Sequence, residues 1–163
     1  KARGRGLLLH VTSEYARIVL PGLGIYAASK FALDALGECL HYELAASGVH
    51  SLMIEPGTFP TTGILGKLVA PADPERSAGY GSVAELPQQL GAGLQGMVES
   101  GMAPDPAAVA AAIIAVIAGP QRPLRTLIPS PDSDNIAAIN TAAATAQTAM
   151  FQRLGMTGLL REG

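Results

Sequence analysis

The chain has 163 residues, of which 48% are hydrophobic and 15% charged, and this composition excludes an intrinsically disordered protein. The formal net charge of −2 offers no basic surface to nucleic acid, and the single cysteine, Cys39, excludes an internal disulfide and a cysteine-rich metal site. No apolar run approaches the roughly 18 residues of a membrane span, and one free cysteine suits a reducing compartment, so we expect a cytoplasmic protein.

A strand–helix–strand unit is predicted in the first third of the chain. Residues 6–12 form a nearly continuous apolar run, which predicts a strand buried on both faces. A loop rich in glycine and proline leads to a helix over about 25–46, and the run 49–55 predicts a second strand. Cys39 is expected to be a small buried hydrophobic residue in this helix. One apolar stripe along the helix is formed by Leu33, Leu36, Leu40 and Leu44.

The rest of the chain begins with a long connection. Residues 58 to about 82 contain several prolines and glycines, and their length predicts a functional loop or lid. The alternation of strands and helices predicts an α/β fold with a parallel sheet. The later elements are predicted as a glycine-weakened helix at about 84–100, a helix from Asp105 and Pro106 to Ala118, a strand at 124–128, and an alanine-rich helix from Asp132 or Ser133 to about Leu154.

Three polar side chains are expected to meet at one edge of this sheet. Ser13 directly follows the first strand, and Tyr26 and Lys30 lie four residues apart at the start of the helix, so they share a face. In parallel α/β sheets, ligands bind beyond the carboxyl ends of the strands. A lysine one turn from a tyrosine favours the phenolate, so the phenol can exchange a proton with an alcohol or carbonyl oxygen. Ser13 would hold that oxygen by a hydrogen bond.

Each of these residues also has an ordinary structural interpretation. Tyr26 and Lys30 could be two amphipathic side chains on a helix surface, with Lys30 and Asp34 as a surface ion pair. Ser13 could be a cap at the end of the strand. The order of strand, serine, loop, Tyr-x-x-x-Lys helix, strand and Pro-Gly favours the functional interpretation.

The remaining polar candidates are assigned structural roles. No carboxylate or cysteine stands at metal-ligand spacing from a histidine, so no metal site is expected. Arg122 and Arg125 are expected to be solvated loop charges. The histidines expected to lie in the core or at the surface are His10, His41 and His50.

Together these motifs resemble the short-chain dehydrogenase/reductase family. The resemblance rests on Ser13 thirteen residues before Tyr26, on the motif Tyr26-Ala-Ala-Ser-Lys30, and on Glu55-Pro56-Gly57 followed by Thr61. The helix that begins near 104–106 and the segment 123–125 are similar to the end of such enzymes, in particular the subgroup of 17β-hydroxysteroid and retinol dehydrogenases. The chain departs from the family pattern at Glu14, where a second serine is common, and at Ala16, where glycine is frequent.

The resemblance implies an NAD(P)-dependent oxidoreductase that transfers hydride between nicotinamide and an apolar alcohol or ketone. Tyr26 would be the general acid–base, Lys30 would promote its ionisation and bind the nicotinamide ribose, and Ser13 would orient the substrate. The region of about 58–103 would cover the substrate. Besides Tyr26 and Lys30, the residues meeting the nicotinamide end of NAD or NADP would be Pro56, Gly57, Phe59 through its main chain and Thr61 through its side chain.

Two features of the family are absent from the 163 residues: the Thr-Gly-x-x-x-Gly-x-Gly loop, which holds the pyrophosphate at a helix N-terminus, and the Asn-Asn-Ala-Gly segment. We therefore expect residues 1–163 to be the C-terminal part of a Rossmann-type, doubly wound NAD(P)-binding domain, with Lys1 just before a middle strand. By itself this part is expected to bind cofactor weakly and to be inactive.

Two alternatives stay open beside the enzyme. One is a truncated or degenerate family member that serves packing or partner binding, and the other is an unrelated α/β domain with chance matches. A glycine-rich loop encoded in frame upstream of Lys1 would favour the enzyme. A homodimer or homotetramer is expected for the full-length protein, because the helix at 25–46 packs between subunits in the family, and an unpaired first strand would also invite pairing.

Overall fold

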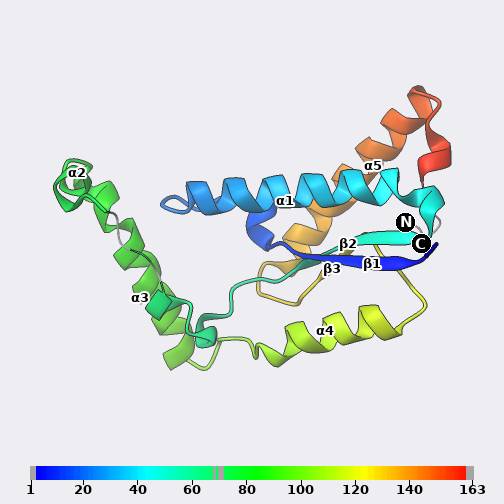
Figure 1. The fold of residues 1–163 in the computed structure, drawn as a ribbon. Coiled ribbons are helices and arrows are strands. Elements are labelled where there is room, and N and C mark those ends of the chain that lie inside the picture. The colour runs from blue at the N-terminus through cyan, green and yellow to red at the C-terminus, as the bar shows by residue number, and fades with distance from the viewer. Residues whose placement is uncertain (1–2, 68, 70–71, 161–163) are drawn as a thin grey trace.

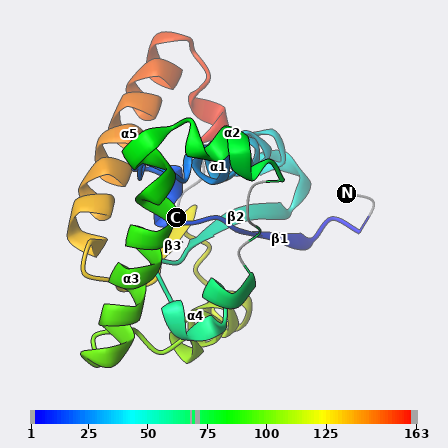
Figure 2. The same ribbon diagram turned by 90° about the vertical axis from the view of Figure 1, so that its left-hand side faces the viewer.

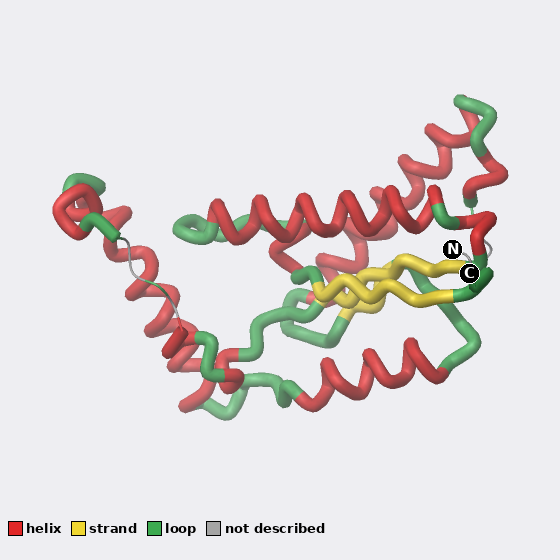
Figure 3. Tube along the Cα trace, in the orientation of Figure 1, coloured by secondary structure: helices red, strands yellow, loops and turns green. Residues whose placement is uncertain are grey.

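The fold is that of a computed structural model, which describes residues 3–67, 69 and 72–160 (Figure 1). Short 3-10 helices join several elements, including Glu14–Ala16 after the first strand and Pro60–Thr62 after the second. Figure 3 shows how helices, strands and loops alternate along the chain. In chain order, the strands and α-helices are β1 (Gly6–Val11), α1 (Gly24–Glu43), β2 (Val49–Glu55), α2 (Pro74–Ala78), α3 (Leu86–Glu99), α4 (Ala107–Ala118), β3 (Arg125–Leu127) and α5 (Ser133–Arg153).

The three strands form one parallel sheet in the order β1-β2-β3. In the register, Gly6 lies opposite Val49, and Met53 lies opposite Arg125. α1 and α5 lie on one face of the sheet and α4 on the other (Figures 1 and 2). Because both faces of the central strand are covered, six of the seven β2 residues are buried. The predicted α/β fold with a parallel sheet is confirmed.

Helix α1 lies close to the sheet at Gly37. The Oγ of Ser51 donates to the carbonyl of Gly37 at 2.8 Å, and a Cβ on Gly37 would lie 2.9 Å from Sδ of Met53. The leucine stripe is not the buried face, since Leu36 is 58% exposed, and Cys39 is exposed, so its predicted burial is wrong. A helix this close to a sheet favours small or hydrogen-bonded side chains beneath it. Those buried in α1 are Ala27, Asp34, Gly37 and His41.

The apolar core lies between the sheet and α4. Leu52 and Ile54 of β2 are fully buried there with Ile128, and Val116 of α4 packs on them. Burial of each large side chain stabilises the fold by roughly 1.5–3 kcal/mol. Before α4, Oδ1 of Asp105 accepts the N–H of Ala107 at 2.9 Å, so its side chain caps the first turn, although the helix begins one residue later than predicted, with Pro106 at the N-cap position.

The connection after β2 is more helical than predicted. Helix α3 was expected, but α2 lies inside the stretch predicted as a loop. The sequence signal for α2 is Asp73-Pro74: the Oδ1 of Asp73 accepts the N–H of Arg76 at 2.9 Å, and Pro74 occupies the first turn. The connection forms an arm beyond the carboxyl ends of the strands, with α2 at its far end (Figure 1). Residues 68, 70 and 71 of the expected 58–103 region lie outside the described residues.

Two structural interpretations of charged residues are wrong. Asp34 is not half of a surface ion pair with Lys30, because it is 2% exposed and pairs with Arg17 and Arg125. Arg125 is therefore no solvated loop charge. Arg122 donates to the carbonyl of Val116 at 2.8 Å. Within the described part of the chain, each helix is too short or too polar to cross a bilayer.

Candidate active site

One cavity of about 480 Å³ lies where β1 and β2 end and α1 begins. Parallel strands end at the same edge of a sheet, so segments far apart in the sequence meet there. The cavity is lined by Ser13 from the end of β1, by Tyr26 and Lys30 from α1, and by residues 56–59 from the end of β2. The structure thus brings together most of the residues that the sequence singled out.

Ser13 forms part of the buried floor of this cavity. Its side chain caps the 3-10 helix at Glu14–Ala16, because its Oγ accepts the N–H of Tyr15 at 3.2 Å. Since that bond uses the oxygen as an acceptor, the hydroxyl proton remains available to a ligand. Ser13 can therefore cap this helix and bind a ligand in the cavity at the same time.

Tyr26 and Lys30 share the face of α1 that borders the cavity. The Nζ of Lys30 donates to the carbonyl of Val11 at 3.0 Å and lies 5.7 Å from the centroid of the Tyr26 ring. The Val11 bond anchors the ammonium group to the end of β1. The side chain of Tyr26 remains accessible, with 39% of the residue exposed.

Tyr15 is a cavity residue that sequence reasoning missed. Its ring lies edge-to-face against that of Tyr26, with centroids 6.1 Å apart and an interplanar angle of 73°. Its N–H also holds Ser13, so Tyr15 contacts two of the three candidate acid–base residues. Its place two residues after Ser13, in the turn that Ser13 caps, is the signal that would have identified it.

The segment after β2 forms another wall. Pro56, Gly57 and Phe59 line the cavity as expected. Thr61 does not belong to the lining, whereas its neighbour Thr62 does, and the hydroxyl of Thr62 donates to the carbonyl of Phe59 at 2.8 Å. The 3-10 helix at Pro60–Thr62 turns the chain at this point, so the spacing from Pro-Gly does not give the lining residue directly.

Behind Gly57, the buried carboxyl group of Glu14 accepts a hydrogen bond from the Oγ of Ser130. Burial raises the pKa of Glu14 above 4.5, partly offset by the Ser130 bond. A Cβ on Gly57 would lie 2.6 Å from Cβ of Ser130 and 2.8 Å from Oε2 of Glu14. Glycine is needed at 57 because these two side chains pack directly against it.

The rest of the cavity is apolar. Leu90 and Leu94 reach it from one face of α3, Val109 from α4, and Leu23 from the turn before α1. A ligand here would meet the Ser13, Tyr26 and Lys30 side chains on one wall and mostly hydrocarbon elsewhere.

The histidines have structural partners. Nε2 of His10 lies 2.8 Å from Oγ of Ser51, and Nδ1 of His41 lies 3.0 Å from the Ser51 carbonyl oxygen. Within the described ranges, no three His, Cys, Asp or Glu side chains are grouped so that they could hold a metal ion.

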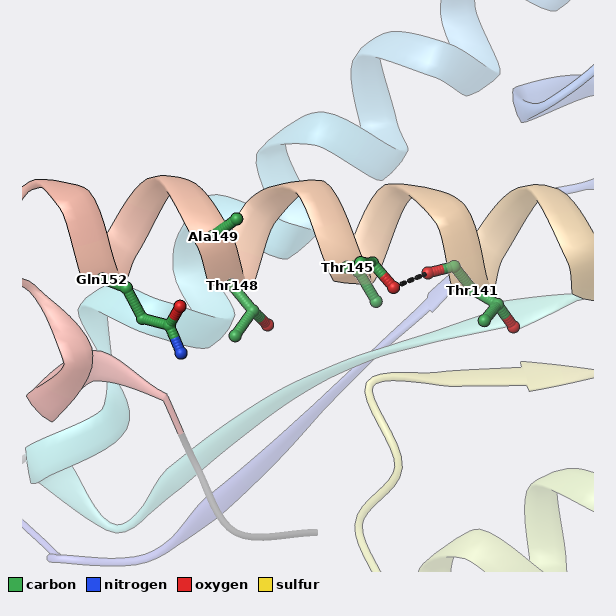
Figure 4. A pocket seen from close by; sticks show the side chains of 6 residues that line it. Thr141, Thr145, Thr148, Ala149 and Gln152 are labelled. Atoms are coloured by element: carbon green, nitrogen blue, oxygen red, sulfur yellow. Dashed lines mark hydrogen bonds between the residues drawn. The ribbon is translucent and has the colours of Figure 1, made fainter.

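A second hollow, of about 530 Å³, runs along α5 (Figure 4). It has no titratable side chain in its lining. Its lining comes from one helix, and the Oγ1 of Thr145 is already bonded to the carbonyl of Thr141 at 2.9 Å. The residues needed for acid–base chemistry lie around the first cavity.

Comparison with known proteins supports a common family for the first part of the chain. Residues 1–71 match the family model for short chain dehydrogenases. The chain is 43% identical over 58 residues to the uncharacterized oxidoreductase YbbO of Escherichia coli, covering 36% of this chain and 22% of that protein. It is 41% identical over 61 residues to 17-beta-hydroxysteroid dehydrogenase type 6 of Mus musculus, covering 37% and 18% respectively.

Solved structures extend the similarity to nearly the whole chain. A short-chain dehydrogenase from Streptomyces avermitilis superposes with a TM-score of 0.57 and 26% identity, covering 94% of this chain and 52% of that one. A putative short-chain dehydrogenase from Novosphingobium aromaticivorans shares the fold, with a TM-score of 0.54 and 14% identity over 94% of this chain and 46% of that one. The chain thus spans about half of these structures and less than a third of the curated relatives.

Proposed function

We propose that this chain, whose residues 1–71 match the family model for short chain dehydrogenases, carries the acid–base and substrate-binding part of an NAD(P)-dependent oxidoreductase. The proposed reaction transfers hydride between nicotinamide and an apolar alcohol or ketone. The observation that carries the proposal is the convergence of Ser13, Tyr26 and Lys30 on one cavity from two separate elements.

In the proposed mechanism, Tyr26 moves a proton between its phenol oxygen and the oxygen of the substrate. Lys30 holds its ammonium group 5.7 Å from the centroid of that ring, so a positive charge lies beside the reacting oxygens. The hydroxyl of Ser13 donates a hydrogen bond to the substrate oxygen and so holds the substrate beside Tyr26. The Ser13 oxygen is itself fixed, because it accepts the N–H of Tyr15. Each role needs only groups that line the cavity.

The donor set fits the nicotinamide end of NAD or NADP. Lys30 places an ammonium group at the cavity wall, where ribose hydroxyls can accept from it, and residues 56–59 offer a wall of main chain and apolar surface to a flat ring. When bound, the nicotinamide supplies or accepts the hydride. These lining residues do not discriminate between NAD and NADP.

The apolar lining supports the proposed substrate class. Leu23, Leu90, Leu94 and Val109 give a hydrocarbon ligand surface to bury, at roughly 25 cal/mol per Å². A charged group placed against these four side chains would lose its hydration without a partner. We therefore propose a substrate whose single reactive oxygen faces Tyr26 and whose remainder is hydrocarbon.

The test is Tyr26→Phe in the complete gene product, assayed with NADH and NADPH against a panel of apolar ketones. Loss of the phenol hydroxyl should lower turnover by roughly 10²–10⁴-fold and weaken cofactor binding, measured by fluorescence, far less than it lowers turnover. Ser29→Ala is the matched control, because it removes an exposed hydroxyl from the same turn of α1 outside the cavity lining. Near-normal turnover in Tyr26→Phe would refute the proposed role. Absence of both cofactor binding and turnover in the wild type would favour a non-catalytic module.

A further inference from the structure

A cluster of charged side chains is buried between the sheet, α1 and α5, outside the cavity. We call it the charge cluster. Its two arginines and three carboxylates are joined by five ion pairs and by one asparagine from α5. The members of the charge cluster are Arg17, Asp34, Glu38, Glu55, Arg125 and Asn140.

Asp34 is at the centre of the charge cluster. Its Oδ2 accepts from Nη2 of Arg17 at 2.7 Å and from Nη2 of Arg125 at 2.8 Å. Nη2 of Arg125 also reaches Oε2 of Glu38 at 2.6 Å. Two arginines from different parts of the chain are therefore held on one turn of α1.

Asn140 and Glu55 extend the charge cluster to α5 and β2. The Nε of Arg17 donates to Oδ1 of Asn140 at 2.6 Å, and Nδ2 of Asn140 donates to Oε2 of Glu55 at 2.7 Å. Oε1 of Glu55 lies 3.3 Å from Nε of Arg125 and 3.5 Å from Nη2 of Arg17. Glu55 is fully buried, so it depends on these partners.

The position of these residues relative to the cavity is informative. Arg17 follows Ser13 by four residues, across the turn that Ser13 caps. Asp34 follows Lys30 by four residues and Tyr26 by eight, so all three lie along one face of α1. Glu55 directly precedes Pro56. Each segment that carries a candidate site residue therefore also carries a member of the charge cluster.

Stability alone is a poor reason for such an arrangement. Desolvation of buried charges cancels much of their attraction, and well-packed apolar residues of similar volume are often as stable or more so. Oδ1 of Asp34 and Oε1 of Glu55 also lack a hydrogen-bond partner. What ion pairs provide that apolar packing does not is a fixed orientation, because their bonds are directional.

We infer that the charge cluster is a positioning device for the candidate active site, holding the Ser13 turn, α1 and the end of β2 in one fixed relation. Asp34, Arg17 and Glu55 touch none of the reacting groups, so they are positioning residues that act through Tyr26, Lys30 and Ser13. The expected effect of the charge cluster on kcat rests on the proposed function. Its effect on the position of Tyr26 does not.

The first test is Asp34→Asn, which keeps the shape of the side chain and removes the charge between the two arginines. In the complete gene product, we expect kcat to fall at least tenfold while KM for the ketone changes less than threefold. Val116→Ala is the control, since it disturbs the core under α4 on the opposite face of the sheet. At a temperature well below both Tm values, Val116→Ala should keep the wild-type kcat. Wild-type kcat in Asp34→Asn as well would overturn the inference.

The second test needs no activity and so separates the two proposals. The chain has four tyrosines, which can be labelled with 3-fluorotyrosine and assigned by Tyr→Phe variants in ¹⁹F NMR. Asp34→Asn should shift the Tyr26 resonance, whereas Val116→Ala should not. Tyr42 donates to Oε1 of Glu38 at 3.0 Å and should shift in Asp34→Asn in any case. A shift of Tyr42 with no shift of Tyr26 would overturn the inference.

A conservative variant covers the case in which Asp34→Asn does not fold. Arg17→Lys keeps the positive charge but loses the planar group that bonds Asp34 and Asn140 together. The same shift of Tyr26 is expected, and an unmoved Tyr26 resonance would count against positioning. If the wild type proved inactive, the proposed function would fail while these resonances would still decide the inference.

Discussion

The close approach of α1 to the sheet can be tested by Gly37→Ala. A Cβ at this position would lie 2.9 Å from Sδ of Met53 and 3.0 Å from Cδ2 of His10. Neither side chain moves freely: Met53 is fully buried, and Nε2 of His10 lies 2.8 Å from Oγ of Ser51. The added methyl group therefore requires a shift of the helix or of its neighbours.

Two opposing contributions decide the effect of Gly37→Ala on the free energy of unfolding. Alanine is better than glycine in a helix interior by roughly 1 kcal/mol. Overpacking a filled core costs roughly 1–3 kcal/mol. Because two contacts fall at or below 3.0 Å, the packing cost should exceed the gain in helix propensity. We expect Gly37→Ala to lower the free energy of unfolding by roughly 1 kcal/mol.

Urea unfolding followed by circular dichroism measures this difference. Ala35→Gly is the matched control, because Ala35 is exposed in the same helix and the exchange is the reverse one. It should cost roughly 1 kcal/mol through helix propensity alone. If Gly37→Ala raised the free energy of unfolding by the amount that Ala35→Gly removes, the methyl group would have room, and the argument from close approach would be refuted.

Two further predictions concern the cap of α4 and the buried carboxyl group behind the cavity. Asp105→Ala removes the acceptor for the N–H of Ala107 and should cost roughly 0.5–2 kcal/mol in urea unfolding, whereas an equal loss in Asp105→Asn would argue against a cap. Burial raises the pKa of Glu14 above 4.5, so the folded protein holds this proton more tightly than the unfolded chain. The resulting stabilisation is complete below pH 4.5 and is lost as pH rises through the folded-state pKa. Relative to the Glu14→Gln variant, the free energy of unfolding of the wild type should therefore fall as pH rises through the folded-state pKa of Glu14. A difference between the two proteins that does not change with pH would contradict the raised pKa.

The residues around the cavity could be predicted because their signals are local. Ser13 and Pro56 follow directly after apolar runs that became β1 and β2. The spacing of four between Tyr26 and Lys30 places them on one helix face whatever the rest of the fold does. Thr62 and Tyr15 were missed for the opposite reason, since their positions depend on 3-10 turns that hydrophobic periodicity does not reveal.

The burial of Asp34 in the charge cluster is linked to the positions of Tyr26 and Lys30 on α1. By sequence alone, Asp34 resembles a surface residue, because it is charged and a lysine lies one turn before it. Its arginine partners lie 17 and 91 residues away, beyond the reach of any local pattern. Yet Tyr26, Lys30 and Asp34 repeat every four residues, so if the first two face the strand ends, the third faces inward beside them. A buried carboxylate needs a cation, and two arginines are near: Arg17 follows β1 after a short turn, and Arg125 begins β3 opposite Met53 of β2. The assignment of Tyr26 and Lys30 to a site is therefore itself the sequence signal for a buried Asp34.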